Sequence, residues 1–186
     1  MNRAWVFNDP MARSPDEPIK RRMGESKIQN LKSKISMVVV AVLVFAADQM
    51  TKILVERRIP DRTVVPVVKG VFNLTSTKNS GAVFGLFADS SVWWKTPLLI
   101  VVSAVLLIAV VTLVVKSHHL HWQTGVGLSL VLGGALSNLF DRIRWGQVED
   151  FLDFYVRGYH WATFNLADSA IVVGTGLIVL QVLFSE

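Results

Sequence analysis

Hydrophobic positions in this chain of 186 residues gather in four long runs, separated by shorter polar segments. The runs cover residues 35–56, 97–115, 124–143 and 164–184, and each approaches the length of about 20 residues that a helix needs to cross a bilayer. An isolated strand would leave its backbone groups without hydrogen bonds in lipid, so we predict a helix for each run. The pattern predicts an all-α integral membrane protein with a bundle of four transmembrane helices.

Two segments outside these runs differ in kind. Residues 1–34 are polar and show no apolar period, so we expect a mobile, cytoplasmic extension before a membrane-embedded domain at 35–186. Residues 57–96 contain short stretches rich in Val, Thr and Phe, at 63–68 and 70–77, between Gly and Pro residues. These stretches predict strands, and hence a small β-sheet cradle on the outer face of the membrane.

The first run could instead be a cleaved signal peptide, because basic residues precede a short apolar stretch. However, its helical pattern continues through Asp48 and Lys52, and no Ala-x-Ala cleavage site precedes Asp48. We therefore expect the first run to stay in the protein as a membrane span.

Composition agrees with a membrane protein and excludes several other classes. Hydrophobic residues make up 52% of the chain and charged residues 18%, against roughly 25% charged in soluble domains. No cysteine is present, which excludes disulfides, thiolate metal sites and a cysteine nucleophile. The net charge of +5 comes from scattered basic residues, so it favours anionic lipid headgroups over nucleic acid. Six Lys or Arg in 20–34, against four in 57–71, predict that both termini are cytoplasmic.

The polar residues within the runs are predicted to meet on one membrane face. Because successive spans alternate in direction, the ends of the first and third runs share a face with the start of the fourth. Charges at membrane depth cost several kcal/mol unless they are paired or solvated, so such a cluster is a candidate functional site. The residues concerned are Asp48, Lys52, Asn138, Asp141, Arg142, Asp150, Asn165 and Asp168.

Asp150 and Asp168 are the strongest candidates for chemistry in this cluster. Two carboxylates held close together share one proton, and such a pair supplies one base and one acid. Asn165 lies three residues before Asp168 and within reach of it on a helix. For Asp48 with Lys52, and for Asp141 with its neighbour Arg142, ion pairs that only hold helices together are an equally open interpretation.

Other chemistries have weaker support. The histidines at 118, 119 and 121 lie in a loop on the opposite face, where exposed histidines near headgroups are a better interpretation than a metal site. Ser137 and Ser169 have no partner that would make either a nucleophile. Small residues four apart in the third run predict close helix packing; they are Gly125, Ser129, Gly133 and Ser137.

Two further functional classes fit the composition alone. A proton-coupled transporter would also place charged residues inside a bundle, but it predicts carboxylates near mid-membrane and an internal repeat, and neither is found here. A structural scaffold would not need two aspartates without cationic partners.

Five short motifs occur in order along about residues 36–184. They are Asp48-Gln49-x-x-Lys52, Asn79-Ser80-Gly81-Ala82, Gly133-Gly134-Ala135-x-x-Asn138-x-x-Asp141-Arg142, Glu149-Asp150-Phe151 and Phe164-Asn165-Leu166-Ala167-Asp168-Ser169. In these motifs and their spacing the chain resembles the bacterial lipoprotein signal peptidases (signal peptidase II).

The resemblance implies an intramembrane aspartic endopeptidase of the bacterial inner membrane, active near its periplasmic face. It implies diacylglyceryl-modified prolipoproteins as substrates, cleaved just before the lipidated cysteine, and membrane phospholipid as surroundings. It also implies that the enzyme needs no cofactor or metal, and we expect a monomer. Asp150 and Asp168 would be the catalytic dyad. The implied substrate-binding or supporting residues are Asn79, Gly81, Asn138, Arg142, Asn165, Asp48, Lys52 and Asp141.

Three positions depart from the family pattern. Val83 stands where a small alanine is expected, and Ser137 replaces a usual glycine before Asn138. Glu149 stands at a commonly apolar position, and a third carboxylate beside the dyad would alter the pKa values of the pair. None of the three departures removes a catalytic position.

Overall fold

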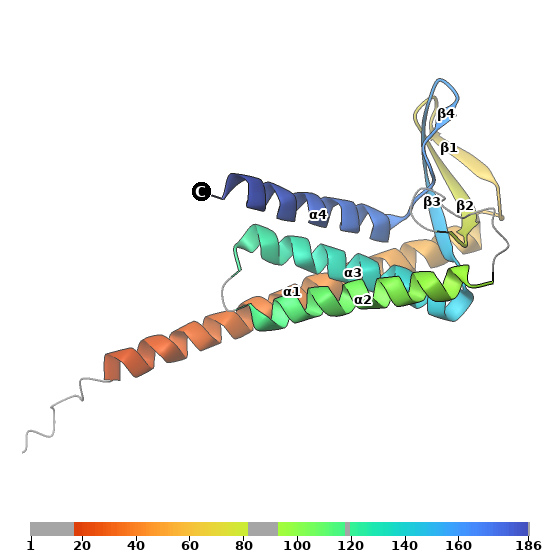
Figure 1. Cartoon of the computed structure of the whole chain (residues 1–186). Helices are drawn as coiled ribbons and strands as arrows, with labels where there is room; N and C mark the ends of the chain where they lie inside the picture. The colour runs from red at the N-terminus through yellow and green to blue at the C-terminus, as the bar shows by residue number, and fades with distance from the viewer. Residues whose placement is uncertain (1–16, 82–92, 118–119, 186) are drawn as a thin grey trace, which may run out of the picture.

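The structure is a bundle of long helices with a small sheet at one end (Figure 1). The computed structural model describes residues 17–81, 93–117 and 120–185. Val83 and two of the three loop histidines lie outside these ranges. Along the chain the elements are α1 (Glu17–Arg58), β1 (Val64–Val68), β2 (Phe72–Asn79), α2 (Lys95–Lys116), α3 (Trp122–Trp145), β3 (Val148–Val156), β4 (Tyr159–His160) and α4 (Leu166–Phe184).

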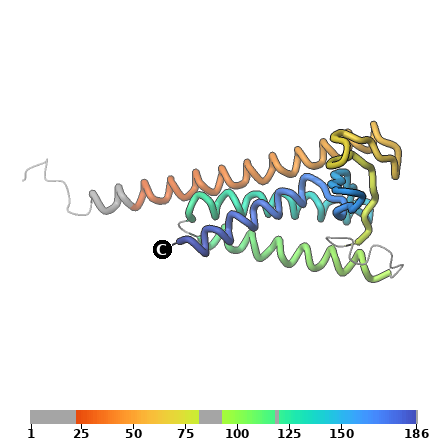
Figure 2. The backbone as a smooth tube through the Cα atoms, turned by 90° about the horizontal axis from the view of Figure 1, so that it is seen from above, coloured from red at the N-terminus to blue at the C-terminus, as the bar shows by residue number. Residues whose placement is uncertain are grey.

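All four helices are long and apolar enough to cross a membrane, as predicted. Helix α3 is the centre of the bundle and packs against α1, α2 and α4 (Figure 2). The other helices keep large apolar side chains on their outer surfaces, and in α2 only Lys95 is buried. An apolar surface of this kind is suited to lipid rather than water.

Helix α1 begins much earlier than the predicted span of 35–56. It starts at Glu17, so residues 17–34, predicted as part of a mobile extension, are helical. Glu, Lys, Gln, Leu and Met are common in residues 23–34 and favour helix, and the membrane span that follows supplies a helix for them to extend. Residues 1–16 are outside the described part of the chain.

Two adjacent glycines allow α3 to approach both α1 and α4 closely. A Cβ on Gly133 would overlap the carbonyl oxygen of Ala41, and one on Gly134 would overlap that of Ala167. The predicted role of the small residues in helix packing is therefore confirmed at Gly133. These approaches bring polar groups on three helices within hydrogen-bond distance of one another.

The sheet has four antiparallel strands in the order β1-β2-β3-β4. Strands β1 and β2 match the predicted stretches, but half of the sheet comes from residues after α3, where we expected only a short connection. The missed signal is the aromatic and β-branched sequence of β3, followed by a turn at Arg157 and Gly158, both with positive φ.

The sheet is fixed to the end of α1 by a small hydrophobic core. Val55 of α1 and Ile59, just after this helix, pack with Phe151 of β3, and Leu74 of β2 packs against this cluster. Strand β2 has a bulge between Leu74 and Thr77, where it contains one residue more than β3. Bulges turn a strand locally. Here the bulge lies directly before the end of β2 that carries Asn79.

Candidate active site

Lys52 forms the centre of a buried charge cluster between α1 and α3. Its Nζ lies 2.6 Å from Asp48 Oδ2 and 2.6 Å from Asp141 Oδ2, and it donates to Asn138 Oδ1 at 3.1 Å. Both carboxylates and the ammonium are almost completely buried. The predicted Asp48–Lys52 pair is present, whereas Asp141 pairs with Lys52 instead of with its neighbour Arg142. A lysine can reach across the helix interface, while adjacent residues on a helix point in different directions.

Asp48 also connects this cluster to the start of α4. Its Oδ1 accepts a hydrogen bond from the backbone N–H of Ala167 at 2.8 Å, and its Oδ2 accepts from Ser137 Oγ at 2.7 Å. The first N–H groups of a helix have no partner inside the helix, and Asp48 supplies one. Ser137, at the expected glycine position, therefore adds a hydrogen bond to the cluster.

Asp150 lies on β3 and is buried, with an exposed fraction of 1%. Its Oδ1 accepts from the side-chain amide of Asn165 at 2.7 Å, and its Oδ2 accepts from that of Asn79 at 2.8 Å. Asn79 is itself held by the backbone N–H of Gly81, which donates to Asn79 Oδ1. Both oxygens of Asp150 are thus oriented by neutral amides rather than by a cation.

Asp168 lies in the first turn of α4, in a capping box with Asn165. The backbone N–H of Asp168 donates to Asn165 Oδ1 at 2.9 Å, and the backbone N–H of Asn165 donates to Asp168 Oδ2 at 3.3 Å. This arrangement satisfies two groups that a helix start leaves open. The other oxygen, Asp168 Oδ1, accepts from Asn138 Nδ2 at 2.7 Å.

Asp150 and Asp168 line one small cavity at the end of the bundle, together with Asn79, Asn138 and Arg142. Its volume of about 20 Å³ exceeds the roughly 10–15 Å³ that one water molecule needs. Val148 and Thr163 complete the lining, and neither was predicted. Thr163 directly precedes Phe164, which pairs with Leu152 on β3, two residues after Asp150. Only this strand pairing could have indicated Thr163.

Arg142 closes the cavity without making an ion pair to its sequence neighbour. Its guanidinium donates to the carbonyl oxygens of Asn138 at 3.2 Å and of Gly81 at 3.3 Å. The second contact ties α3 to the segment after β2. All ten predicted site residues thus belong to one continuous arrangement, in which Asn138 joins the Lys52 cluster to Asp168.

Comparison with known proteins identifies the family. Residues 40–184 match the family model described as "Signal peptidase (SPase) II". The chain belongs to the signal peptidase II family.

Curated relatives of the signal peptidase II chain extend over most of its length. A lipoprotein signal peptidase of Solibacter usitatus is 43% identical over 144 residues, which cover 77% of this chain and 88% of the relative. One from Desulforapulum autotrophicum is 38% identical and covers 84% of this chain and 97% of the relative. A bacterial membrane enzyme solved by the in meso method at 1.9 Å is 30% identical, with a TM-score of 0.70 over 81% of this chain and 94% of that one. The protein is thus a multi-pass membrane peptidase of the signal peptidase II type.

The environment of Asp150 raises the pKa of its carboxyl group to about 7. Burial is the largest cause, because it penalises the charged form, and the nearby charge of Asp168 adds to it. The hydrogen bonds from Asn79 and Asn165 favour the charged form and act in the opposite direction. Asp150 can therefore hold or release a proton near neutral pH.

Glu149 does not lie beside the dyad as we had expected. It accepts a hydrogen bond from Ser76 Oγ at 2.5 Å and lies opposite Lys78 across the β2–β3 pair. Alternation along a strand places neighbouring side chains on opposite faces, so Glu149 points away from Asp150. Burial raises the pKa of Glu149.

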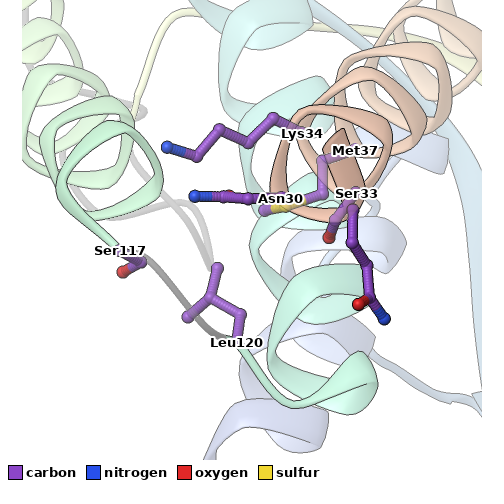
Figure 3. A pocket seen from close by; sticks show the side chains of 7 residues that line it. Asn30, Ser33, Lys34, Met37, Ser117 and Leu120 are labelled. Atoms are coloured by element: carbon purple, nitrogen blue, oxygen red, sulfur yellow. The ribbon is translucent and has the colours of Figure 1, made fainter. Parts of the chain in front are cut away.

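Another polar cavity, at the opposite end of the bundle, differs from the dyad cavity in the side chains that line it (Figure 3). It has a volume of about 150 Å³, and Lys34 beside it donates to the carbonyl oxygen of Val115 near the end of α2. No carboxylate lines it among the described residues. The described residues also contain no group of three His, Cys, Asp or Glu that could hold a metal ion.

Proposed function

We propose that this protein removes signal peptides from diacylglyceryl-modified prolipoproteins by cleaving just before the lipidated cysteine, with Asp150 and Asp168 as the catalytic dyad. One observation carries the proposal: two carboxylates from different elements line one cavity of about 20 Å³, large enough for a single water molecule. Peptide hydrolysis consumes one water, and a dyad that shares a proton can both activate it and protonate the products.

In this mechanism Asp150 carries the shared proton, consistent with its pKa of about 7, and Asp168 is the base. Asp168 takes a proton from water as the water oxygen bonds to the scissile carbonyl carbon, while Asp150 donates its proton to the carbonyl oxygen. The C–N bond then breaks, and the proton held by Asp168 passes to the leaving nitrogen. As the C=O bond re-forms, Asp150 recovers its proton. The products are a signal peptide with a new carboxylate and a lipidated cysteine with a free amine.

The remaining predicted residues hold the dyad and the substrate in this proposal. Asn79, Asn138, Arg142 and Asn165 offer amide and guanidinium groups at the cavity, and Gly81 fixes the position of Asn79. The Lys52 cluster with Asp48 and Asp141 fixes Asn138 and the start of α4. No step in this mechanism needs a metal or an organic cofactor.

The position of the dyad suits a substrate that arrives from the bilayer. The carboxylates lie at the end of the bundle, where α3 ends and α4 begins, so the site is near the membrane surface and within reach of water. The apolar outer surfaces of the helices allow the acyl chains of the substrate to remain in lipid. We assign the dyad to the periplasmic side of the inner membrane, and both termini to the cytoplasm, from the basic residues before the first span. We further propose that one chain is sufficient for activity.

The test is an assay of the purified protein with two precursors that differ only in the diacylglyceryl group. We expect cleavage of the modified precursor alone, and mass spectrometry of the product should show the lipidated cysteine as its first residue. Equal cleavage of both precursors, or a cut at another bond, would contradict the proposed specificity.

A further inference from the structure

A different cavity, larger than the one at the dyad, lies at the same end of the bundle but on the other side of the Lys52 cluster. It has a volume of about 440 Å³ and lies between α1, the end of α3 and the sheet. Lys52 and Asp141 form part of its wall, whereas Asp150 and Asp168 do not line it. Its remaining lining is Gln49, Ile53, Glu56, Arg57, Lys78, Phe140, Arg144, Trp145, Gln147 and Glu149.

Two arginines at this cavity have no carboxylate partner within ion-pair distance among the described residues. Arg57 is in the last turn of α1, and Arg144 is in the last turn of α3. The guanidinium of Arg144 lies 4.8 Å from the ring centroid of Trp145 and 5.7 Å from that of Phe140. Stacking of this kind orients a guanidinium and leaves its N–H groups available. Arg57 lines the same cavity, and guanidinium groups suit a phosphate.

Two glutamates in the cavity lining carry the opposite charge, Glu56 near the end of α1 and Glu149 on β3. Lys78 lies opposite Glu149 across the β2–β3 pair, and its Nζ is 4.0 Å from Glu56 Oε1. Among the described residues, no cation lies within ion-pair distance of the Glu149 carboxylate. Burial and the charge of Glu56 also raise the pKa of Glu149, so a further cation at this position would stabilise its ionised form.

The cavity continues onto the lipid-facing surface of the helices. Ile53 lines it and is 47% exposed, and Phe140 makes an edge-to-face contact with Phe45 along the seam between α1 and α3. Trp145 and the two arginines are residue types that commonly lie where a membrane meets water. A molecule bound here would have a charged part in the cavity and an apolar part along this seam.

We propose that this cavity binds the headgroup of a phospholipid that carries both a phosphate and a primary ammonium, as phosphatidylethanolamine does. The phosphate contacts Arg57 and Arg144, and the ammonium contacts Glu56 and Glu149. One acyl chain follows Ile53 and Phe140 along the seam. The site is separate from the dyad, and the proposal does not depend on the proposed reaction.

The arginine side is tested by lipid binding to the purified protein, measured by native mass spectrometry with added phosphatidylethanolamine. We expect one tightly held lipid on the wild type and at least a tenfold loss of affinity in the Arg57→Gln/Arg144→Gln variant. Arg58→Gln is the matched control, because Arg58 is exposed next to Arg57 but does not line the cavity. Equal retention in the double variant and the control would overturn the proposal and show adventitious surface lipid only.

The ammonium side is tested on the unmodified protein by comparing lipids that share the same acyl chains. We expect phosphatidylethanolamine to be held more tightly than phosphatidylglycerol, which lacks the ammonium, and phosphatidylcholine, whose ammonium has no N–H to donate. The Glu56→Gln/Glu149→Gln variant should lose this preference while still binding phosphatidylglycerol. The absence of any preference in the wild type would contradict the proposal. No substrate is present in these measurements, so a failed peptidase assay would leave their result unaffected.

Discussion

Asn165 donates a hydrogen bond from its side-chain amide to Asp150 while its side-chain oxygen caps the helix that carries Asp168. The two contacts are 2.7 Å and 2.9 Å long, and Asn165 is completely buried. One side chain therefore fixes a strand carboxylate relative to the start of a membrane helix. The relationship explains how two aspartates eighteen positions apart in the chain reach the same cavity.

The two contacts of Asn165 can be separated by substitution. Serine caps a helix about as well as asparagine but is too short to reach Asp150, so Asn165→Ser should keep most of the stability and lose activity. A lost hydrogen bond to a charged group costs about 1.5–3 kcal/mol, or roughly ten- to a hundredfold in rate. Asn165→Ala should lose activity and also about 1 kcal/mol of stability. Parallel measurements of cleavage and thermal unfolding check this, and full activity in Asn165→Ser would contradict it.

Asn79→Ala and Arg142→Ala should impair turnover much more than folding. Asn79 donates to Asp150, and Arg142 lines the cavity and holds Gly81, so each change disturbs the site rather than a core. We expect about ten- to a hundredfold lower kcat/KM for each variant. Arg58→Ala, at an exposed position, is the control for loss of charge. Unchanged kinetics in either site variant would remove that residue from the site.

Lys52→Met should strongly destabilise the fold. The lysine compensates two buried carboxylates, and breaking a buried ion pair on one side costs about 3–5 kcal/mol because a buried charge is left alone. Lys69→Met, at an exposed turn between β1 and β2, should leave stability almost unchanged. Thermal unfolding in detergent compares the two variants. Similar unfolding temperatures would show that the charge cluster contributes little.

Stability and activity should both depend on the protonation of Asp150. Its pKa rises from 3.8 to about 7 on folding, so the folded state binds the proton more tightly than the unfolded state. The stability that this proton contributes is present below about pH 4 and is lost as the pH rises through about 7. Cleavage should follow a bell-shaped pH profile with its alkaline limb near pH 7, where the shared proton leaves the pair.

Unfolding and cleavage, each measured over the same pH range, check both statements. In the Asp150→Asn variant the dependence of stability on pH between about 4 and 7 should flatten. A wild-type rate that keeps rising well above pH 7 would contradict the role of a protonated Asp150.

The helices could be predicted because the membrane imposes a simple rule of length and apolar composition. That rule gives no boundary for the N-terminal part of α1 before the membrane span, which extends back to Glu17 with ordinary helix-forming residues. Strand β3 was missed because its aspartates interrupt the apolar pattern, and Asp150 and Asp153 are both buried with hydrogen-bond partners.

The convergence of the site could be predicted from the alternating direction of the spans, but its hydrogen-bond network could not. Asp141 forms its ion pair with Lys52, and not with its neighbour Arg142 as we had predicted. This difference depends on which side of α3 faces α1. The position of Glu149 away from the dyad depends on the alternation of side chains along β3, a strand that the sequence did not predict.

The most direct test of the dyad is cleavage of a lipidated precursor by Asp150→Asn, Asp168→Asn and the double variant. Asparagine keeps the size and most hydrogen bonds of aspartate but cannot cycle a proton. Each single variant should therefore lose nearly all activity and still bind substrate, and the double variant should be little worse, because residues that act as a unit are not additive. Substantial turnover by either single variant, correctly inserted in the membrane, would contradict the assignment of Asp150 and Asp168 as the catalytic pair.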